Sequence, residues 1–218
     1  MKITISKENY LKSIAEAEAE GETVISATLA RWLNVSPPAV AMATRRLARD
    51  GFIAVDSSGR ITLTPAGGEI AFRVLQRHHL IERMLAEVFG MEWFKVHDEA
   101  EQLEHAVSED FEQRLRERLG SEGPCPHGNL LKNDRPEDRR RRGLLPLAEL
   151  AVGRHATVRA VFERDRPLLE YLDGLGIRPG ATIRKTAQNC DDTLVLESEC
   201  GLKPLGLRAA EKIWVEPR

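Results

Sequence analysis

The stretch VHDEAEQLEH, residues 96–105, brings histidine and carboxylate side chains together at a spacing that suits a metal ion. The surrounding apolar residues predict a helix over residues 96–119, with Ala100, Leu103 and Val107 on its apolar stripe. Because an α-helix advances about 100° per residue, one quadrant beside this stripe should hold a polar set. That set consists of His97, Glu101, Glu104, His105 and Ser108.

A second histidine–carboxylate pair, His78 and Glu82, is spaced four residues apart in another predicted helix over residues 66–89. It also borders an apolar stripe, where carboxylates repel each other and are poorly hydrated. The alternative is that both sets are ordinary charged helix flanks whose histidines are satisfied by hydrogen bonds. Two such pairs on consecutive helices favour a site for a divalent cation over that alternative.

The ligand chemistry narrows the choice of metal. Imidazole and carboxylate groups suit Mn²⁺, Fe²⁺, Co²⁺, Ni²⁺ or Zn²⁺, and the lack of a thiolate in the cluster favours the harder metals. The sequence CPHG adds Cys125 and His127, which are weak evidence alone but could supply two further ligands near an existing cluster.

The segment before these helices predicts a DNA-binding unit. Short helices are expected over residues 6–20, 26–35 and 36–51, with Ser6, Ser26 and Ser36 as their N-caps. Two β-like runs follow in FIAVDSSGRITLTP, separated by the turn sequence Asp-Ser-Ser-Gly. Three helices followed by a hairpin is the element order of a winged helix-turn-helix, in which the third helix enters the DNA major groove.

Arginines are placed as this interpretation requires. Arg45, Arg46 and Arg49 lie on the third predicted helix, Arg31 on the second, and Arg60 in the hairpin. Guanidinium groups suit phosphate oxygens and guanine edges. The alternative, that these arginines only solvate a surface helix, is disfavoured by the order of the elements.

The composition limits the classes of protein to which the chain can belong. The chain has 218 residues, 42% hydrophobic and 30% charged, with a net charge of −2. This argues against wholesale polyanion binding but allows a local basic face. No apolar run approaches the roughly 20 residues of a membrane span, and no signal peptide opens the chain, so we expect a cytoplasmic protein without a membrane partner. The three cysteines are too few for a disulfide framework.

The remainder divides into a connector and a small β domain. Residues 121–146 are rich in Gly, Pro and charge, and the run Arg139–Arg142 is interpreted as solvated linker rather than a DNA contact. The short β-like runs after Leu147 predict an SH3-like barrel, in which Cys190 and Cys200 are expected as packing thiols. The fold class is therefore α+β. The expected domains are a winged helix-turn-helix (1–65), a helical dimerisation and metal-binding domain (66–120), a linker (121–146) and the SH3-like domain (147–218).

Motifs along nearly the whole chain resemble one family, the metal-dependent transcriptional repressors that include diphtheria toxin repressor and the manganese transport regulator. ENYLKSI is similar to the first helix of the family, VSPPAVAMATRRLARDG to its recognition helix, and LTPAGGEIA to the passage after its wing. RHHLIER and VHDEAEQLEH resemble the ligand helices, and CPHGN the linker of many members. LLEYLDGLGIRPGATI resembles the SH3-like domain of the longer members, also found in FeoA proteins.

The resemblance implies two metal sites. The primary, regulatory site would use Glu101, Glu104 and His105 together with Asn9, where methionine or aspartate is usual in the family. Because iron sensors of the family carry a cysteine at the position of Glu101, the resemblance implies Mn²⁺ as cofactor, with Fe²⁺ as the alternative. Lys12, one turn after Asn9, would add positive charge there. For the second site the resemblance leaves two ligand sets open: His78, Glu82 and His97, or Glu82, Cys125, His127 and Asp165.

The resemblance also implies which side chains face the bases of DNA: Ser36, Pro38, Ala39 and Met42. Met42 offers apolar contact with thymine methyls rather than a hydrogen bond. The resulting hypothesis is a homodimer that binds a palindromic double-stranded operator when a metal ion is bound, and that represses genes for metal uptake.

Two other functions are weighed against this hypothesis. A metallohydrolase would need an open coordination position, a cleft and a nucleophile or substrate motif, and the sequence offers no such motif. An interaction module built on the SH3-like part would leave the arginine-bearing helix and hairpin unexplained. We therefore expect a regulator, not an enzyme.

Overall fold

The computed structural model describes residues 3–120 and 123–218, which form two compact units of mixed helix and sheet. The first unit holds the described residues up to His78 together with Glu104–Val107, and the second holds His79–Leu103 and the described part of Ser108–Arg218. The predicted α+β class is confirmed. Within the described ranges, no helix is long and apolar enough to cross a membrane.

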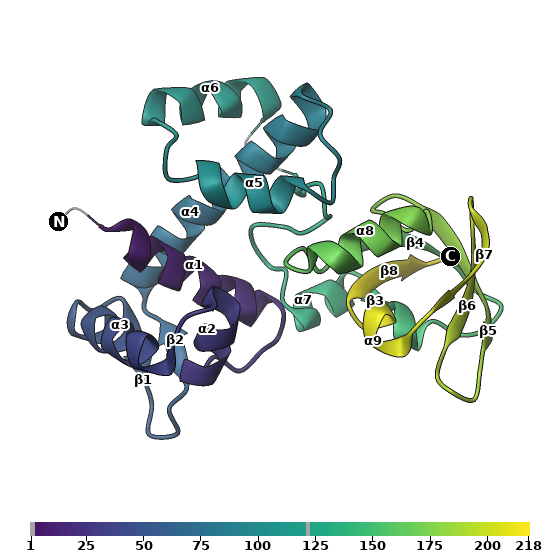
Figure 1. The fold of residues 1–218 in the computed structure, drawn as a ribbon, viewed down its shortest axis with the longest axis horizontal. Coiled ribbons are helices and arrows are strands. Elements are labelled where there is room, and N and C mark those ends of the chain that lie inside the picture. Colours follow the sequence, from purple (N-terminus) through teal and green to yellow (C-terminus); the bar gives the residue numbers. More distant parts are fainter. Residues whose placement is uncertain (1–2, 121–122) are drawn as a thin grey trace. The chain divides into compact units, whose positions relative to one another are not determined.

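The first unit is a winged helix (Figure 1). It contains α1 (Ile5–Ala19), α2 (Ser26–Leu33) and α3 (Pro37–Arg49), followed by the hairpin of β1 (Ile53–Val55) and β2 (Ile61–Leu63). The strands pair antiparallel, and the hairpin turn extends beyond the helices (Figure 1). Its core consists of fully buried apolar side chains, among them Leu11, Ile14, Leu29, Val40, Leu47 and Ile61.

Local sequence explains where these helices begin. Ser36 is the N-cap of α3 and proline fills its first helical position, as predicted. The predicted caps of the first two helices are wrong. Thr4, not Ser6, precedes α1, and its side chain accepts a hydrogen bond from the Lys7 amide. Ile25, not Ser26, precedes α2. In the hairpin turn, Asp56 Oδ1 accepts hydrogen bonds from the amides of Ser58 and Arg60.

The helices that carry the candidate ligands differ from the prediction in one important respect. α4 spans Pro65–Arg83 and ends in a π-helical turn over Met84–Val88. The single helix predicted over 96–119 is instead two helices, α5 (Val96–Leu103) and α6 (Glu109–Leu119). Ser108 caps α6 by accepting from the Phe111 amide, and acidic residues fill the first turn after it. Glu104 and His105 therefore lie in the turn between the helices, not on a helical quadrant.

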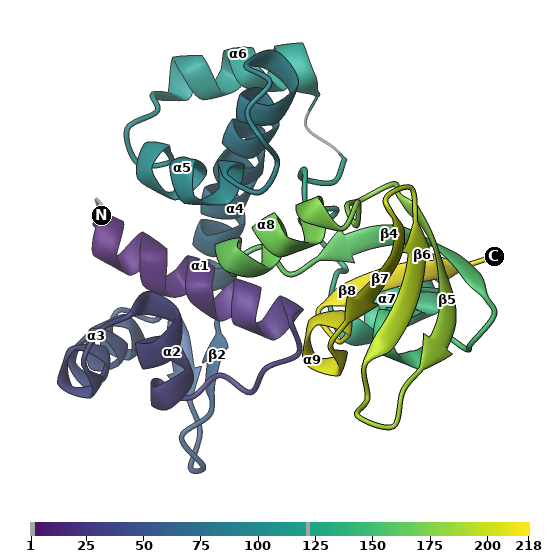
Figure 2. The ribbon, with the colours of Figure 1, turned by 45° about the vertical axis from the view of Figure 1, so that its right-hand side comes forward.

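The second unit is built around a six-stranded antiparallel sheet of order β3-β8-β4-β5-β6-β7 (Figure 2). The strands are β3 (Leu145–Pro146), β4 (His155–Val161), β5 (Thr182–Gln188), β6 (Leu194–Ser198), β7 (Gly201–Leu205) and β8 (Ile213–Pro217). Its short helices are α7 (Pro136–Arg141), α8 (Arg166–Gly174) and α9 (Leu207–Ala210), with a 3-10 turn over Leu147–Glu149. Apolar side chains of the strands and of α8 form its core, which Trp93 and Phe94 also contact.

Two expectations about this unit are wrong. The arginine run is not solvated linker throughout, because Arg139 on α7 is buried, donates to Asp134 and Asn129, and stacks over the ring of Trp214. A guanidinium can be buried when carboxylate, amide and aromatic partners surround it. Cys190 and Cys200 are exposed rather than packing thiols, because both fall at turns between strands; Cys125 is buried.

Candidate metal centres and DNA-binding surface

The first cluster of metal-ligating side chains lies within the first unit, where the turn after α5 meets α1. The His105 ring places Nδ1 3.0 Å from Glu8 Oε2 and Nε2 2.6 Å from Asn9 Oδ1. Glu104 Oε1 is 3.3 Å from His105 Nε2. The structure therefore brings Asn9 and Glu104 to Nε2 of His105, and it places Glu8, which the sequence interpretation missed, at the other ring nitrogen, Nδ1.

The turn that carries these ligands is held by basic side chains. Glu104 is buried, and its other oxygen, Oε2, is 2.8 Å from Lys12 Nζ and 2.6 Å from His78 Nδ1. Arg77 donates to the backbone carbonyl of Glu104, an oxygen that the end of α5 leaves without a helical partner. Burial alone would raise the pKa of Glu104, but the hydrogen bond with His78 and the charge of Lys12 lower it below its usual value.

Glu101, the remaining residue of the expected primary set, belongs to the second unit. Arg164 donates to its Oε1 at 2.9 Å, and His97 Nε2 lies 3.6 Å from the same oxygen. The Glu101 carboxylate thus has a guanidinium partner.

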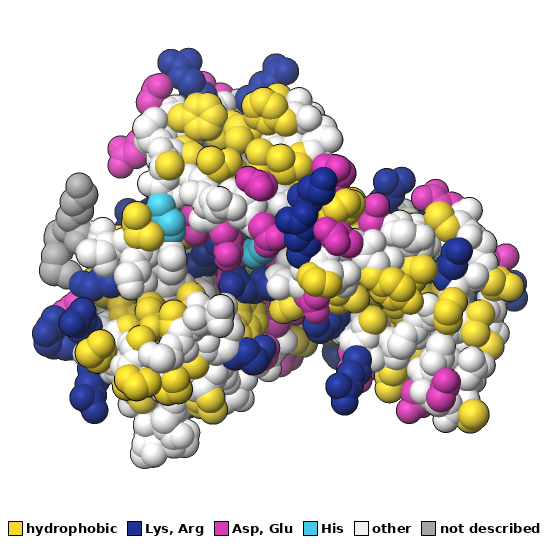
Figure 3. All heavy atoms as spheres, viewed as in Figure 1, with side chains coloured by type: hydrophobic (Ala, Val, Ile, Leu, Met, Phe, Trp, Pro, Cys, Tyr) yellow, Lys and Arg dark blue, Asp and Glu magenta, His cyan; other side chains and the backbone are white. Residues whose placement is uncertain are grey.

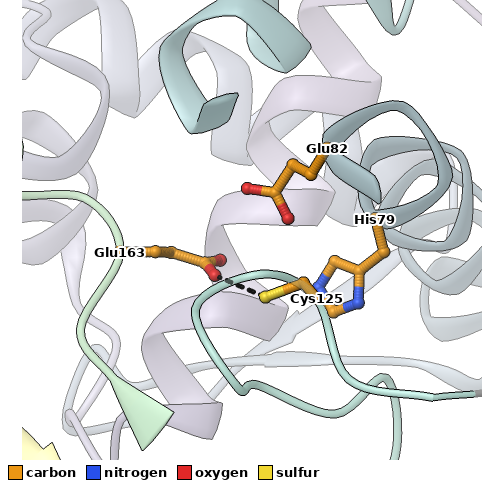
Figure 4. Close-up of side chains that lie close together, drawn as sticks. All are labelled: His79, Glu82, Cys125 and Glu163. Carbon is orange, nitrogen blue, oxygen red and sulfur yellow. Dashed lines mark hydrogen bonds between the residues drawn. The ribbon is translucent and has the colours of Figure 1, made fainter. Parts of the chain in front are cut away.

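The second cluster lies within the second unit and gathers ligands from three segments. His79 and Glu82 come from α4, Cys125 from the loop after α6, and Glu163 from the loop after β4 (Figure 4). One ligand atom of each lies within 4.8 Å of the others. Cys125 Sγ is 3.3 Å from Glu163 Oε2. An imidazole, two carboxylates and a thiol therefore lie close enough together to contact one ion.

Two further histidines border this cluster. His127 Nδ1 is 3.4 Å from Glu82 Oε1 and 3.5 Å from Glu163 Oε2. His97 Nδ1 is 3.3 Å from Glu82 Oε1 and 3.9 Å from Glu163 Oε1. The carboxylates of Glu82 and Glu163 therefore each contact both imidazoles. Carboxylate oxygens, imidazole nitrogens and the Cys125 sulfur lie close together in the interior of the second unit.

The cluster strongly perturbs protonation. Burial alone would lower the pKa of His97, but hydrogen bonds with Glu101 and Glu82 raise it to about 10. Burial also opposes the charged form of His127, yet the charge of Glu82 and the hydrogen bond with Glu163 raise its pKa to about 9. Burial and the charges of Glu163 and Glu82 raise the pKa of the Cys125 thiol. The carboxylates therefore favour protonated histidines, and a bound cation would take the place of these protons.

The residues fit a metal ion. His127 is fully buried, and its Nε2 has no hydrogen-bond partner among the described residues. Such a buried nitrogen carries a desolvation cost that a cation would remove. The donor set of imidazole, carboxylate and thiol is one that divalent transition metals take.

His79 and Glu163 are not among the ligands predicted from the sequence. The predicted histidine, His78, lies in the first unit against Lys12 and Glu104. Asp165, which the resemblance implied as a ligand, is the N-cap of α8 and pairs with Lys212. Glu163 follows β4 by two residues, and only the position of that strand end could have indicated it.

The residues predicted to bind DNA lie on the exposed face of α3 and in the hairpin. Ser36, Pro38 and Met42 are exposed and Ala39 is half-buried. The exposed arginines are Arg45, Arg46, Arg49 and Arg60. Lys and Arg side chains gather over the α3 region (Figure 3). Arg49 also donates to Asp50, while Arg31 pairs with Glu22.

A winged helix bearing an exposed basic recognition helix, combined with buried ligand clusters, defines a metal-dependent DNA-binding regulator. Comparison with known proteins agrees. Residues 2–59 match the iron dependent repressor N-terminal DNA binding domain, residues 64–130 the iron dependent repressor metal binding and dimerisation domain, and residues 145–217 the FeoA domain.

Individual relatives give the family. Diphtheria toxin repressor of Corynebacterium glutamicum is 32% identical over 185 residues, covering 81% of each chain. The iron-dependent repressor IdeR of Mycobacterium tuberculosis is 39% identical over 122 residues, covering 56% of this chain and 53% of its own. A solved manganese-dependent transcriptional repressor in complex with manganese has a TM-score of 0.83 at 29% identity, covering 97% of this chain and 100% of its own. The chain belongs to the diphtheria toxin repressor family of metal-dependent transcriptional repressors, which are DNA-binding proteins rather than enzymes.

Proposed function

We propose that this protein is a manganese-activated repressor that binds a palindromic operator as a homodimer in the cytoplasm and controls metal-uptake genes. The observation that carries the choice of metal is the oxygen-rich cluster at the turn after α5. At Nε2 of the His105 imidazole it offers the Glu104 carboxylate and the amide oxygen of Asn9, and the Glu8 carboxylate lies at Nδ1 of the same ring. Carboxylate, amide and imidazole donors without sulfur suit Mn²⁺.

The proposed regulatory ligands are Asn9, Glu101, Glu104 and His105, with Glu8 as an additional candidate. For the second site, the contacts favour Glu82, Cys125 and His127 together with Glu163 and His79, in place of Asp165. The other ligand set, His78, Glu82 and His97, remains a second proposal for this position. His97 supports it through its contact with Glu82.

Metal binding activates the protein by a shift of conformational population. The ion supplies positive charge that joins ligands from α1 and from the turn after α5. Because it binds the DNA-competent form more tightly than other forms, it raises the population of that form. Arg45, Arg46 and Arg60 then contribute salt-dependent phosphate contacts, and the exposed side chains at the start of α3 contact base edges.

The test is a comparison of metals on one operator. A duplex selected from a random pool in the presence of Mn²⁺ is titrated with protein under anaerobic conditions, with Mn²⁺, Fe²⁺ or a chelator, and binding is followed by fluorescence anisotropy. We expect binding with Mn²⁺ at concentrations where Fe²⁺ gives little, and none with chelator. Activation by Fe²⁺ alone at low concentration would contradict the choice of manganese.

Iron is the second candidate, and a specific observation favours it. Cys125 places a thiol within the second cluster, and thiolate ligands suit Fe²⁺ better than Mn²⁺. Relatives of this chain are also named iron-dependent repressors. The same titration with Cys125→Ser protein separates the roles, because loss of Fe²⁺ activation with retained Mn²⁺ activation would assign iron to the second cluster.

A further inference from the structure

A lysine is buried among the proposed regulatory ligands. Lys12 lies on α1, and its side chain is only 3% exposed. Its Nζ is 2.8 Å from Glu104 Oε2, 3.0 Å from His78 Nδ1 and 3.8 Å from Glu16 Oε1. Lysines are almost never this buried unless carboxylates or other acceptors surround the ammonium.

The two oxygens of Glu104 have different partners. Oε2 contacts the Lys12 ammonium and His78 Nδ1, whereas Oε1 lies 3.3 Å from His105 Nε2. His105 in turn contacts Glu8 and Asn9. The carboxylate is therefore divided between a side that holds a cation built into the chain and a side that faces the oxygen-rich ligands.

We propose that Lys12 is a tethered cation of the regulatory site, which occupies Glu104 Oε2 and sets the affinity for the divalent ion at His105. The inference rests on the proposed function and deepens it, because it names the residue that tunes the site. The ammonium neutralises the carboxylate that the incoming ion needs, and it repels that ion. The protein therefore binds Mn²⁺ only at concentrations higher than the remaining ligands would allow.

Two ordinary explanations predict other behaviour. If Lys12 only stabilised the fold, its replacement would lower stability with and without metal alike. If Lys12 left the carboxylate on metal binding, its replacement would change the affinity little beyond the cost of breaking the contact. If Lys12 is a tethered cation, in contrast, its replacement should strengthen metal binding and lower the stability of the metal-free protein.

The test compares Lys12→Met with Lys12→Arg, which keeps the charge, and with Lys7→Met. Lys7 is a matched control because it lies on the same helix and forms a 2.7 Å pair with Asp50, away from the ligands. All proteins carry Cys125→Ala and Glu163→Gln, so that the second cluster does not contribute. Mn²⁺ binding is measured by isothermal titration calorimetry without DNA.

We expect Lys12→Met to bind Mn²⁺ at least about tenfold more tightly than the parent, since removing a charge a few ångströms from the ion is worth that much even at a high effective dielectric. Lys12→Arg and Lys7→Met should stay within about threefold of the parent. Equal or weaker binding by Lys12→Met would overturn the assignment of Lys12 alone. Absence of Mn²⁺ binding in every protein would instead contradict the proposed function, and the inference would fall with it.

A second measurement keeps the proposal testable if Lys12→Met folds poorly. In a crystal of the unsubstituted protein grown with Mn²⁺, anomalous scattering locates the ion. Lys12 Nζ should remain within hydrogen-bond distance of Glu104 Oε2 while the ion is bound. An ion that displaces Lys12 from Glu104 would overturn the proposal.

Discussion

Buried charges in this protein are stabilised by specific partners rather than by solvent. The guanidinium of Arg139 shows this outside the metal clusters, because it donates to Asp134 at 2.9 Å and to Asn129 at 3.2 Å and lies over Trp214. Replacing it with methionine removes the charge but leaves the Asp134 carboxylate buried, and breaking such a pair costs about 3–5 kcal/mol.

Arg139→Met should therefore lower the melting temperature of the protein by roughly 10 °C. Arg141→Met is the matched control, because Arg141 lies on the same helix, α7, and its side chain is 76% exposed. This substitution should shift the melting temperature by less than about 2 °C. Thermal unfolding followed by circular dichroism measures both. Equal shifts in the two variants would contradict the structural role of Arg139.

The histidines of the second cluster predict how the metal-free protein responds to pH. The pKa values of His97 and His127 are raised to about 10 and about 9, above the ordinary 6.5. Between the ordinary pKa of 6.5 and these raised values, the folded state binds more protons than the unfolded state. The free energy of unfolding therefore decreases as pH rises through this range. The contribution is fully present below about pH 6.5 and is lost as pH passes 9 to 10.

In the presence of chelator, the melting temperature should fall between pH 6.5 and pH 9. His97→Gln with His127→Gln should show a flatter dependence, because glutamine does not titrate. A melting temperature that rises over this range in the unsubstituted protein, with the same rise in the double variant, would show that these imidazoles are not protonated as described.

At the scale of elements, local signals predicted most of the fold. The proline after Ser36 and the Asp-Ser-Ser-Gly turn specified α3 and the hairpin through backbone preferences that act within a few residues. The break between α5 and α6 was missed because the apolar spacing continues through it. The helix ends there because Glu104 and His105 contact α1 and Arg77, and contacts between distant segments leave no local signal.

Contacts between distant segments also determine which site residues could be predicted from the sequence. Residues carried by strong helical patterns, such as Glu82 and His97, could be proposed from sequence. Glu163 and Cys125 come together only because the loop after β4 and the loop after α6 meet in the second unit. The pairing of such loops depends on the packing of the whole unit, so spacing along the chain could not indicate it.

The Cys125 loop depends on a glycine. Gly128 has φ +88°, and a Cβ there would lie 1.9 Å from the Arg159 carbonyl oxygen. Its amide also donates to the Cys125 carbonyl. Gly128→Ala should therefore displace Cys125 and His127 and weaken metal binding by the second cluster at least about tenfold, in keeping with the loss of a positioning contact.

Gly143→Ala is the control, because Gly143 has a similar φ of +82° but nothing within 4 Å of its Cβ position. Competition with a metal-binding dye, in proteins that carry Glu104→Ala to silence the first cluster, measures the effect. If both alanine variants weakened binding equally, backbone strain alone would explain the result and the close approach to Arg159 would be irrelevant.

At the scale of the molecule, the residues proposed to bind DNA differ from those proposed to bind metal. Arg45 and Arg46 on α3 are exposed and far in sequence from the ligands, so their replacement should act through phosphate contacts alone. Arg45→Ala with Arg46→Ala should weaken operator binding about tenfold or more and reduce the steepness of its salt dependence by about two per subunit. The Mn²⁺ affinity, measured without DNA, should stay unchanged; a parallel loss of Mn²⁺ binding would contradict this separation.

The most direct test of metal control is operator binding by the Glu104→Ala, His105→Ala protein. Fluorescence anisotropy of the selected duplex is measured against Mn²⁺ concentration for this variant and for the unsubstituted protein, with circular dichroism to verify that both are folded. The unsubstituted protein should bind only when Mn²⁺ is present, and the variant should fail to respond to Mn²⁺ at any concentration that activates its parent. Undiminished operator binding by the variant, with or without Mn²⁺, would contradict the account.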